Sequence, residues 1–163
     1  METVLVRLAS VAEIVALRHR ELRPGFPASA AHFEDDEAAT TRHLGAFHPD
    51  SGEVLGCASF VASPWEERAA FRLRGMATRA DRLRHGIGTR VLRLGETIIR
   101  TETDATMLWC NARLVAVPFY VRLGWEIVSD VFDIPTVGPH HRMVRTLSAQ
   151  PTTAGSRSTP TGQ

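Results

Sequence analysis

The segment from residue 71 to residue 112 constrains the fold more than any other part of the sequence. It begins with the strand-like run "FRLRGMAT" and ends with the apolar run "ATMLWCNA", which is typical of a buried strand. Between the two runs, apolar residues recur at helical spacing at Ile87, Val91, Leu94 and Ile98. A strand, a helix and a second strand in this order form a βαβ unit with parallel strands and a right-handed crossover. The sequence therefore predicts an α/β fold.

The turn that precedes this helix, "DRLRHGIG", favours anion binding. A helix N-terminus has free N–H groups and about half a positive charge, and glycine lets a phosphate approach the backbone. Gly86 and Gly88 supply that access, and Arg82 and Arg84 add positive charge. The phosphate-loop pattern is absent, and the dinucleotide pattern G-x-G-x-x-G would need a glycine in place of Val91. A glycine turn that only joins a strand to a helix is the alternative.

Further elements are expected on both sides of this unit. "TVLVRLAS" predicts a strand, and the S-x-x-E capping box of Ser10 and Glu13 predicts the start of a helix. The acidic beginning of "FEDDEAATTRHL" predicts a second helix. "LGAFHPDSGEVLGCASFVAS" predicts a hairpin, and "LVAVPFYVRLG" predicts a short helix. "WEIVSDVFD" and "HHRMVRTL" predict one strand each. The expected sheet is mixed.

Length and composition limit the class of protein. The 163 residues predict one domain over residues 1–148, followed by a flexible tail over 149–163 that has no large apolar residue. The net charge of +1 gives no reason to expect a nucleic acid or a membrane surface as partner. No signal peptide is expected, which favours a cytoplasmic protein. The two cysteines lie in apolar runs and are expected to be buried thiols.

A second motif follows the βαβ unit and supports the interpretation of the glycine turn as an anion-binding turn. "NARLVAVPFYVRLGW" carries Ala116, Tyr120 and Gly124, with Trp125 after the glycine. Together with "LRHGIG", it resembles the GNAT superfamily of acyl-CoA-dependent N-acetyltransferases. "WCNAR" and "FDIPTVGPHHRM" are further similar to a little-characterised branch of it. The resemblance implies a GNAT-like α/β (α+β) fold, with a mixed, mostly antiparallel sheet, a central parallel strand pair and flanking helices.

The resemblance also implies a site for acetyl-CoA as co-substrate. Backbone groups of three residues would hold the pantetheine arm: Met76, Ala77 and Thr78. The turn would hold the pyrophosphate through Arg84, His85, Gly86, Ile87, Gly88 and Thr89. Arg113 takes the asparagine position of the second motif and is included with the cofactor-binding residues. Tyr120 would lie beside the thioester sulfur and act as the catalytic general acid.

The sequence also departs from the family pattern. Leu83 stands where the family has arginine or glutamine, and the usual positions of a glutamate base carry Arg72 and Leu108. No usual base is therefore evident, which predicts an acceptor amine of low pKa or a water relay to a distant group such as His32 or Glu34. The polar residues expected near the acceptor are Arg23, His32, Glu34, Asp133 and His140. No metal-binding pattern is present in the sequence, and no metal is expected.

The function predicted from the sequence is acetyl transfer from acetyl-CoA to a small-molecule or peptide amine. Two alternatives stay open. One is a catalytically silent acyl-CoA-binding module, and the other is a different nucleotide-phosphate binder that would leave the second motif unexplained. The identity of the acceptor is open, and so is the formation of a homodimer.

Overall fold

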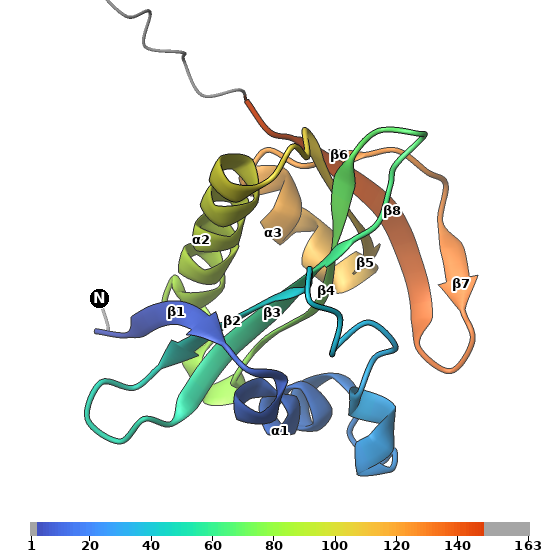
Figure 1. Ribbon diagram of the computed structural model, residues 1–163. Coiled ribbons are helices and arrows are strands. Elements are labelled where there is room, and N and C mark those ends of the chain that lie inside the picture. Colours follow the sequence, from blue (N-terminus) through green and yellow to red (C-terminus); the bar gives the residue numbers. More distant parts are fainter. Residues whose placement is uncertain (1–2, 149–163) are drawn as a thin grey trace, which may run out of the picture.

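The computed structural model describes residues 3–148, which form one mixed sheet with helices on both faces (Figure 1). The strand order is β1-β2-β3-β4-β5-β8-β6, and β7 pairs with β8. The strands are β1 (Leu5–Ala9), β2 (Arg42–Phe47), β3 (Val54–Ala62), β4 (Ala70–Thr78), β5 (Met107–Arg113), β6 (Glu126–Ile127), β7 (Phe132–Ile134) and β8 (Gly138–Thr146). Only β4 and β5 are parallel among these pairings. The predicted fold class is confirmed.

Three α-helices and three short 3-10 helices connect these strands. The α-helices are α1 (Val11–Leu22), α2 (Ile87–Glu102) and α3 (Val117–Arg122). The 3-10 helices are η1 (Ala28–Ala31), η2 (Ala80–Arg82) and η3 (Leu114–Ala116). The predicted capping box begins α1: the Glu13 N–H donates to Ser10 Oγ, and the Ser10 N–H donates to the Glu13 carboxylate.

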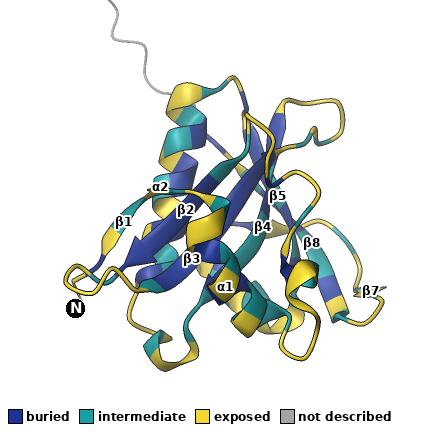
Figure 2. Cartoon of the chain, turned by 60° about the horizontal axis from the view of Figure 1, so that its bottom comes forward, coloured by how far each residue is buried: buried dark blue, intermediate teal, exposed yellow. Residues whose placement is uncertain are grey.

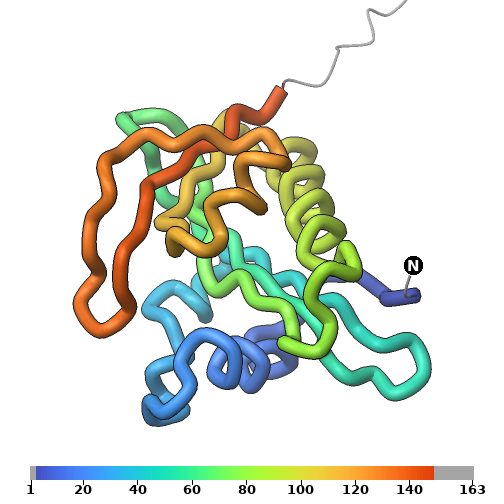
Figure 3. The backbone as a smooth tube through the Cα atoms, turned by 180° about the vertical axis from the view of Figure 1, so that it is seen from behind, coloured from blue at the N-terminus to red at the C-terminus, as the bar shows by residue number. Residues whose placement is uncertain are grey.

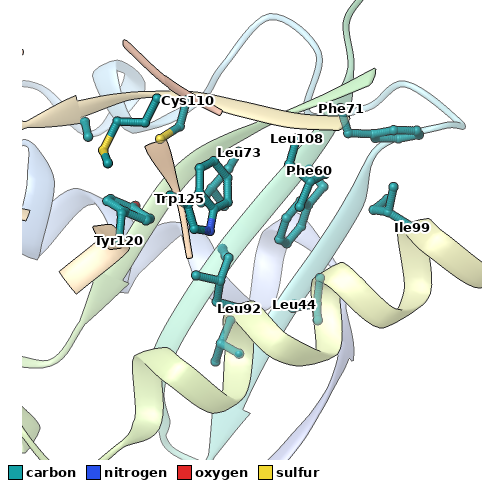
Figure 4. Close-up of a cluster of buried hydrophobic side chains, with 14 of the residues drawn as sticks. Leu44, Phe60, Phe71, Leu73, Leu92, Ile99, Leu108, Cys110, Tyr120 and Trp125 are labelled. Carbon is teal, nitrogen blue, oxygen red and sulfur yellow. The ribbon is translucent and has the colours of Figure 1, made fainter. Parts of the chain in front are cut away.

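The sheet separates two apolar clusters, because neighbouring residues of a strand point to opposite faces. Ala58 belongs to the larger cluster with α2, whereas Cys57 packs with Ile14 and Leu17 of α1. The central strands are mostly buried, and exposed residues gather in loops and on the outer sides of the helices (Figure 2). Figure 4 shows Tyr120 at one edge of the larger cluster.

Two predictions about secondary structure are wrong. Residues 33–41 contain turns in place of the predicted second helix, and the short helix η1 precedes them. The buried Asp36 carboxylate in this segment accepts hydrogen bonds from Arg18 and from the Phe33 N–H. This acid therefore stabilises a loop and not the N-terminus of a helix. The predicted strand "WEIVSDVFD" is two short strands, β6 and β7. The predicted flexible tail, 149–163, lies outside the described residues.

A β-bulge in β4 interrupts its pairing with β3. Cys57 pairs with Ala77 and Ser59 pairs with Arg74, so two residues of β4 oppose one residue of β3. Gly75 occupies the bulge with a φ of 59°, a left-handed conformation that glycine adopts without strain. A Cβ atom at Gly75 would lie 2.7 Å from Nε of the buried Arg18. The close approach of this side chain therefore requires glycine at the bulge.

Gly75→Ala should lower the free energy of unfolding by about 2 kcal/mol, because it combines left-handed strain with crowding against Arg18. Gly52→Ala is the matched control, since its φ is 72° and no atom lies within 4 Å of its Cβ position. Gly52→Ala introduces the left-handed strain alone, so its free energy of unfolding should fall by only about 1 kcal/mol. Urea unfolding of both variants measures the difference. Equal losses would mean that Arg18 moves aside freely and does not impose the glycine.

Candidate functional site

The parallel strands β4 and β5 separate along their length and open the candidate site. Their pairing covers Ala70–Arg72 and Met107–Trp109, after which no pairing is found within residues 3–148. Two cavities lie at the separated ends. The larger cavity has a volume of about 850 Å³, and the smaller cavity has a volume of about 360 Å³. Both are lined by Met76, Val115, Ala116 and Tyr120, so they meet at these residues.

The larger cavity lies between the end of β4, the glycine turn and α3. Figures 1 and 3 show α3 beside α2, and Arg93 of α2 donates to the Leu123 carbonyl at the end of α3. Most of the predicted cofactor-binding residues line this cavity: Met76, Ala77, Thr78, Arg84, Gly86, Ile87, Gly88 and Thr89. His85 and Arg113 are not among its lining residues.

The glycine turn brings the N-terminus of α2 and several arginines to the lining of the larger cavity. Gly86 is the N-cap of α2 with a φ of 77°, and Arg84 has a φ of 66°. The first N–H groups of an α-helix have no acceptor within the helix, so they are available to an anion. Arg82 and Arg122 also line the cavity. Arg122 was missed by the sequence analysis, although its position two residues after Tyr120 could have indicated it.

Tyr120 lies where the two cavities meet. It is only 6% exposed, and its ring contacts those of Phe119 and Trp125 at centroid distances of 5.2 and 5.3 Å. Burial raises the pKa of the Tyr120 phenol well above its usual value, and the nearby Cys110 adds to this. The hydroxyl is therefore protonated at neutral pH. It makes no hydrogen bond to another described residue, which leaves it able to donate to a ligand.

The smaller cavity is lined by basic side chains from four elements or the loops beside them. They are Arg23, Arg72, Arg74, Arg113 and His140. Of the polar residues that the sequence analysis proposed near the acceptor, Arg23 and His140 line this cavity, whereas His32, Glu34 and Asp133 do not. Arg113, predicted on the cofactor side, lies here, and its Nη2 donates to the Leu22 carbonyl at 3.0 Å.

His140 presents a nitrogen that can accept a proton. Its Nδ1 lies 2.7 Å from the Gly138 carbonyl oxygen, which can only accept, so Nδ1 carries the hydrogen. In the neutral ring, Nε2 is then the unprotonated nitrogen. Cys110 also lines this cavity, but burial raises the pKa of its thiol to about 12. The Cys110 thiol therefore keeps its proton near neutral pH and is not a proton acceptor, whereas Nε2 of the neutral His140 ring has a free lone pair.

Neither a metal site nor a membrane span is found in residues 3–148. No three His, Cys, Asp or Glu side chains in this part of the chain are grouped so that they could hold a metal ion. No described helix combines the length and the apolar character needed to cross a bilayer.

Comparison with known proteins connects this geometry to a family. Residues 10–125 match the model of the acetyltransferase (GNAT) family. An uncharacterized N-acetyltransferase of Bacillus subtilis (strain 168), YitI, is 35% identical over 151 residues, which cover 87% of this chain and 95% of that protein.

Solved structures share the fold at low sequence identity. An aminoglycoside 6'-N-acetyltransferase complexed with coenzyme A has a TM-score of 0.71 at 16% identity, covering 90% of this chain and 99% of that chain. A chain of the NatC complex bound to Gag peptide and CoA has a TM-score of 0.73 at 15% identity, covering 91% and 100%. These similarities show that the chain has the same fold. One of the two structures is named for an aminoglycoside and the other for a Gag peptide, which are different kinds of molecule.

Proposed function

The chain belongs to the acetyltransferase (GNAT) family, and we propose that it transfers an acetyl group from acetyl-CoA to an amine by direct attack. One observation carries this proposal: the larger and the smaller cavity meet at Tyr120. A thioester held in one cavity would there face an amine held in the other. Two cavities with one shared wall suit a two-substrate transfer better than the binding of a single ligand.

Acetyl-CoA fits the larger cavity by the chemistry of its lining. The pyrophosphate would lie at the N-terminus of α2, where free N–H groups, Arg82 and Arg84 supply positive charge. The pantetheine arm would extend along Met76–Thr78 and pair with the backbone of β4 as an added strand would. The thioester would then reach Tyr120, with its carbonyl oxygen near the N–H of Ala77 or Thr78.

The transfer needs bond changes and proton movements that balance. The neutral amine nitrogen forms a bond to the thioester carbon, the C–S bond breaks, and the leaving thiolate takes the proton of the Tyr120 hydroxyl. The attacking nitrogen, now positively charged, then loses one proton, which returns to the Tyr120 phenolate directly or through water, so that the products are a neutral amide, the free thiol and the original tyrosine. His140 Nε2 accepts the proton that the ammonium form of the acceptor must lose, directly or through water. His140 thus takes the place that the sequence analysis gave to His32 or Glu34, neither of which lines the smaller cavity.

Gly88→Val should weaken coenzyme A binding at least about tenfold, or about 1.4 kcal/mol. A Cβ at Gly88 would touch Met76 Cε and Phe119 Cζ at 3.4 Å, so the branched side chain fills space that lines the larger cavity. Calorimetry with coenzyme A measures the loss. Thr97→Val, on the exposed side of the same helix, controls for a valine in α2. Unchanged affinity in a folded Gly88→Val protein would falsify the placement of the cofactor.

His140→Gln should lower kcat/KM about tenfold, because the Gln side chain has no nitrogen that can take up a proton. His141→Gln is the matched control: its ring contacts the Ser129 carbonyl, and it does not line the smaller cavity. Steady-state kinetics on both variants measure the effect. If the two variants behave alike, the proton leaves by another route and His140 only packs against Phe132.

A silent acyl-CoA-binding module is the second candidate, favoured by the lack of any carboxylate lining the smaller cavity within residues 3–148. It would bind coenzyme A and transfer nothing. A screen of amines with acetyl-CoA and a thiol-release readout separates the two functions. Release that depends on an amine supports the transferase. Coenzyme A binding without release on any amine supports the module.

A further inference from the structure

The smaller cavity holds an unusual concentration of positive charge. Four arginines line it, from the end of α1, from β4 and from β5: Arg23, Arg72, Arg74 and Arg113. No aspartate or glutamate lines it in the described part of the chain. A cavity that received a cationic amine alone would place an ammonium group against four guanidinium groups. The side that would receive the acceptor is therefore unsuited to a purely cationic molecule.

Aromatic rings position two of these guanidinium groups without neutralising them. Arg72 and Arg74 are two residues apart in β4, so their side chains lie on the same face of the sheet. The Arg72 guanidinium lies 5.1 Å from the Trp109 ring centroid, and that of Arg74 lies 4.3 Å from the Phe33 centroid. A ring face orients a guanidinium and leaves its N–H groups able to donate. Both side chains are thus held in place with unused donors.

The positive charge of this cluster is not balanced inside the cavity. The side chains of Arg72 and Arg74 make no hydrogen bond or ion pair with any residue from 3 to 148, and Arg72 Nε is buried without an acceptor. Burial lowers the pKa of Arg72 to about 10, and repulsion by Arg74 and Arg142 adds to this. Burial also lowers the pKa of Arg74, and repulsion by Arg18 and Arg23 acts in the same direction, while Asp35 and Asp36, which do not line the cavity, raise it.

We propose that the acceptor is a small amine that carries its own oxyanion, a carboxylate or a phosphate, which Arg72 and Arg74 bind. The inference rests on the proposed function and names its substrate class. Guanidinium groups match the two oxygens of a carboxylate or phosphate with two parallel N–H groups. The volume of about 360 Å³ suits a molecule the size of an amino acid or an amino sugar phosphate.

The same charge helps the chemistry of an anionic amine. The oxyanion offsets the repulsion between the arginines and the ammonium form, so the molecule can enter. Once bound, the nearby positive charge lowers the pKa of the ammonium group and increases the fraction of neutral, nucleophilic amine. This effect reduces the demand on His140 and agrees with an acceptor of low amine pKa, the kind expected from the sequence.

Matched acceptors test the inference. L-glutamate is compared with L-glutamic acid diamide, which has no carboxylate, and glucosamine 6-phosphate with glucosamine, which separates a carboxylate from a phosphate as the source of charge. Spermidine supplies a purely cationic amine. We expect kcat/KM to be at least about tenfold higher for the anionic member of one or both pairs, and no transfer to spermidine. Equal or better transfer to the partners that lack an oxyanion, or to spermidine, would overturn the inference and leave the proposed transferase function unaffected.

Variants of the cluster localise the effect. Arg72→Gln and Arg74→Gln should each raise KM for the anionic acceptor about tenfold and leave KM for acetyl-CoA unchanged, whereas Arg72→Lys should recover part of the loss. Arg100→Gln on α2, outside both cavities, is the control. An unchanged acceptor KM in both glutamine variants would overturn the assignment.

A binding measurement keeps the test independent of turnover. If no amine is acetylated, the proposed function fails, and calorimetry of glutamate and glucosamine 6-phosphate with the coenzyme A complex decides the anion site. Binding that is lost in Arg72→Gln supports the site. Failure of both anionic amines to bind overturns it.

Discussion

Tyr120→Phe is expected to lower kcat by roughly 10- to 10³-fold and to change acetyl-CoA affinity by less than about 1 kcal/mol. Phenylalanine keeps the ring and its contacts with Phe119 and Trp125, so only the hydroxyl is lost. Because burial raises the pKa of this phenol, the wild-type hydroxyl is protonated throughout the neutral range and able to donate. Desolvation also raises the pKa of a leaving thiolate, so the proton transfer from the phenol need not be strongly uphill.

Steady-state kinetics and direct acetyl-CoA binding on one preparation measure both parts of this result. A thermal melt of the same preparation controls for folding. A fall in kcat that is matched by an equal loss of affinity would place Tyr120 in binding. Turnover like that of the wild type would mean that water or another group protonates the sulfur, and that Tyr120 only packs.

Asp36→Asn should be the most destabilising of the substitutions considered, at about 3–5 kcal/mol. The Arg18 side chain is fully buried, and its Nη1 lies 2.8 Å from Asp36 Oδ2. Arg18 also donates to the Ala31 carbonyl and to Ser59 Oγ, so it joins α1 to β3 and to the loop that precedes β2. Removal of the carboxylate charge leaves a buried cation without its counter-charge.

Thermal melts at neutral pH should show a lower Tm for Asp36→Asn, by about 10 °C. Glu13→Gln is the control, because it removes an exposed pairing with Arg7 and keeps an acceptor for the capping box. Its Tm should stay near that of the wild type. Similar Tm values for Asp36→Asn and Glu13→Gln would show that the buried pair contributes no more than an exposed one.

The dependence of stability on pH follows from the same pair. Burial raises the pKa of Asp36, but hydrogen bonds from Arg18 and the Phe33 N–H outweigh it, so the net shift is downward. A carboxyl whose pKa is lower in the folded state stabilises fully above its unfolded pKa, near 4, and loses this contribution as pH falls further. The Tm of the wild type should therefore drop below about pH 4 more steeply than that of Asp36→Asn.

Features formed by residues close together in the sequence could be predicted from the sequence alone. The turn before α2 is a run of consecutive residues, and the helix that carries Tyr120 follows its strand directly. The capping box at Ser10 is equally local. Such features depend on backbone conformation and short spacing, and these are what a sequence pattern encodes.

The smaller cavity could not be predicted, because tertiary structure assembles it. Arg113 and His140 face each other only through the register of β5 with β8, and Arg72 joins them through the separation of β4 from β5. The second helix was predicted wrongly for a related reason. Acids suit a helix N-terminus, but Asp36 is held by Arg18, a partner 18 residues earlier in the chain.

The central claim is that an acetyl group passes from the larger cavity to an amine in the smaller one. Incubation with isotopically labelled acetyl-CoA and an anionic amine, followed by mass spectrometry, measures the acetylated amine and free coenzyme A in the same sample. We predict that the two products form in equal amounts, that the label resides on the amine, and that Tyr120→Phe slows both together. Coenzyme A release without acetylated amine, or bound acetyl-CoA that stays intact with every acceptor, would contradict it.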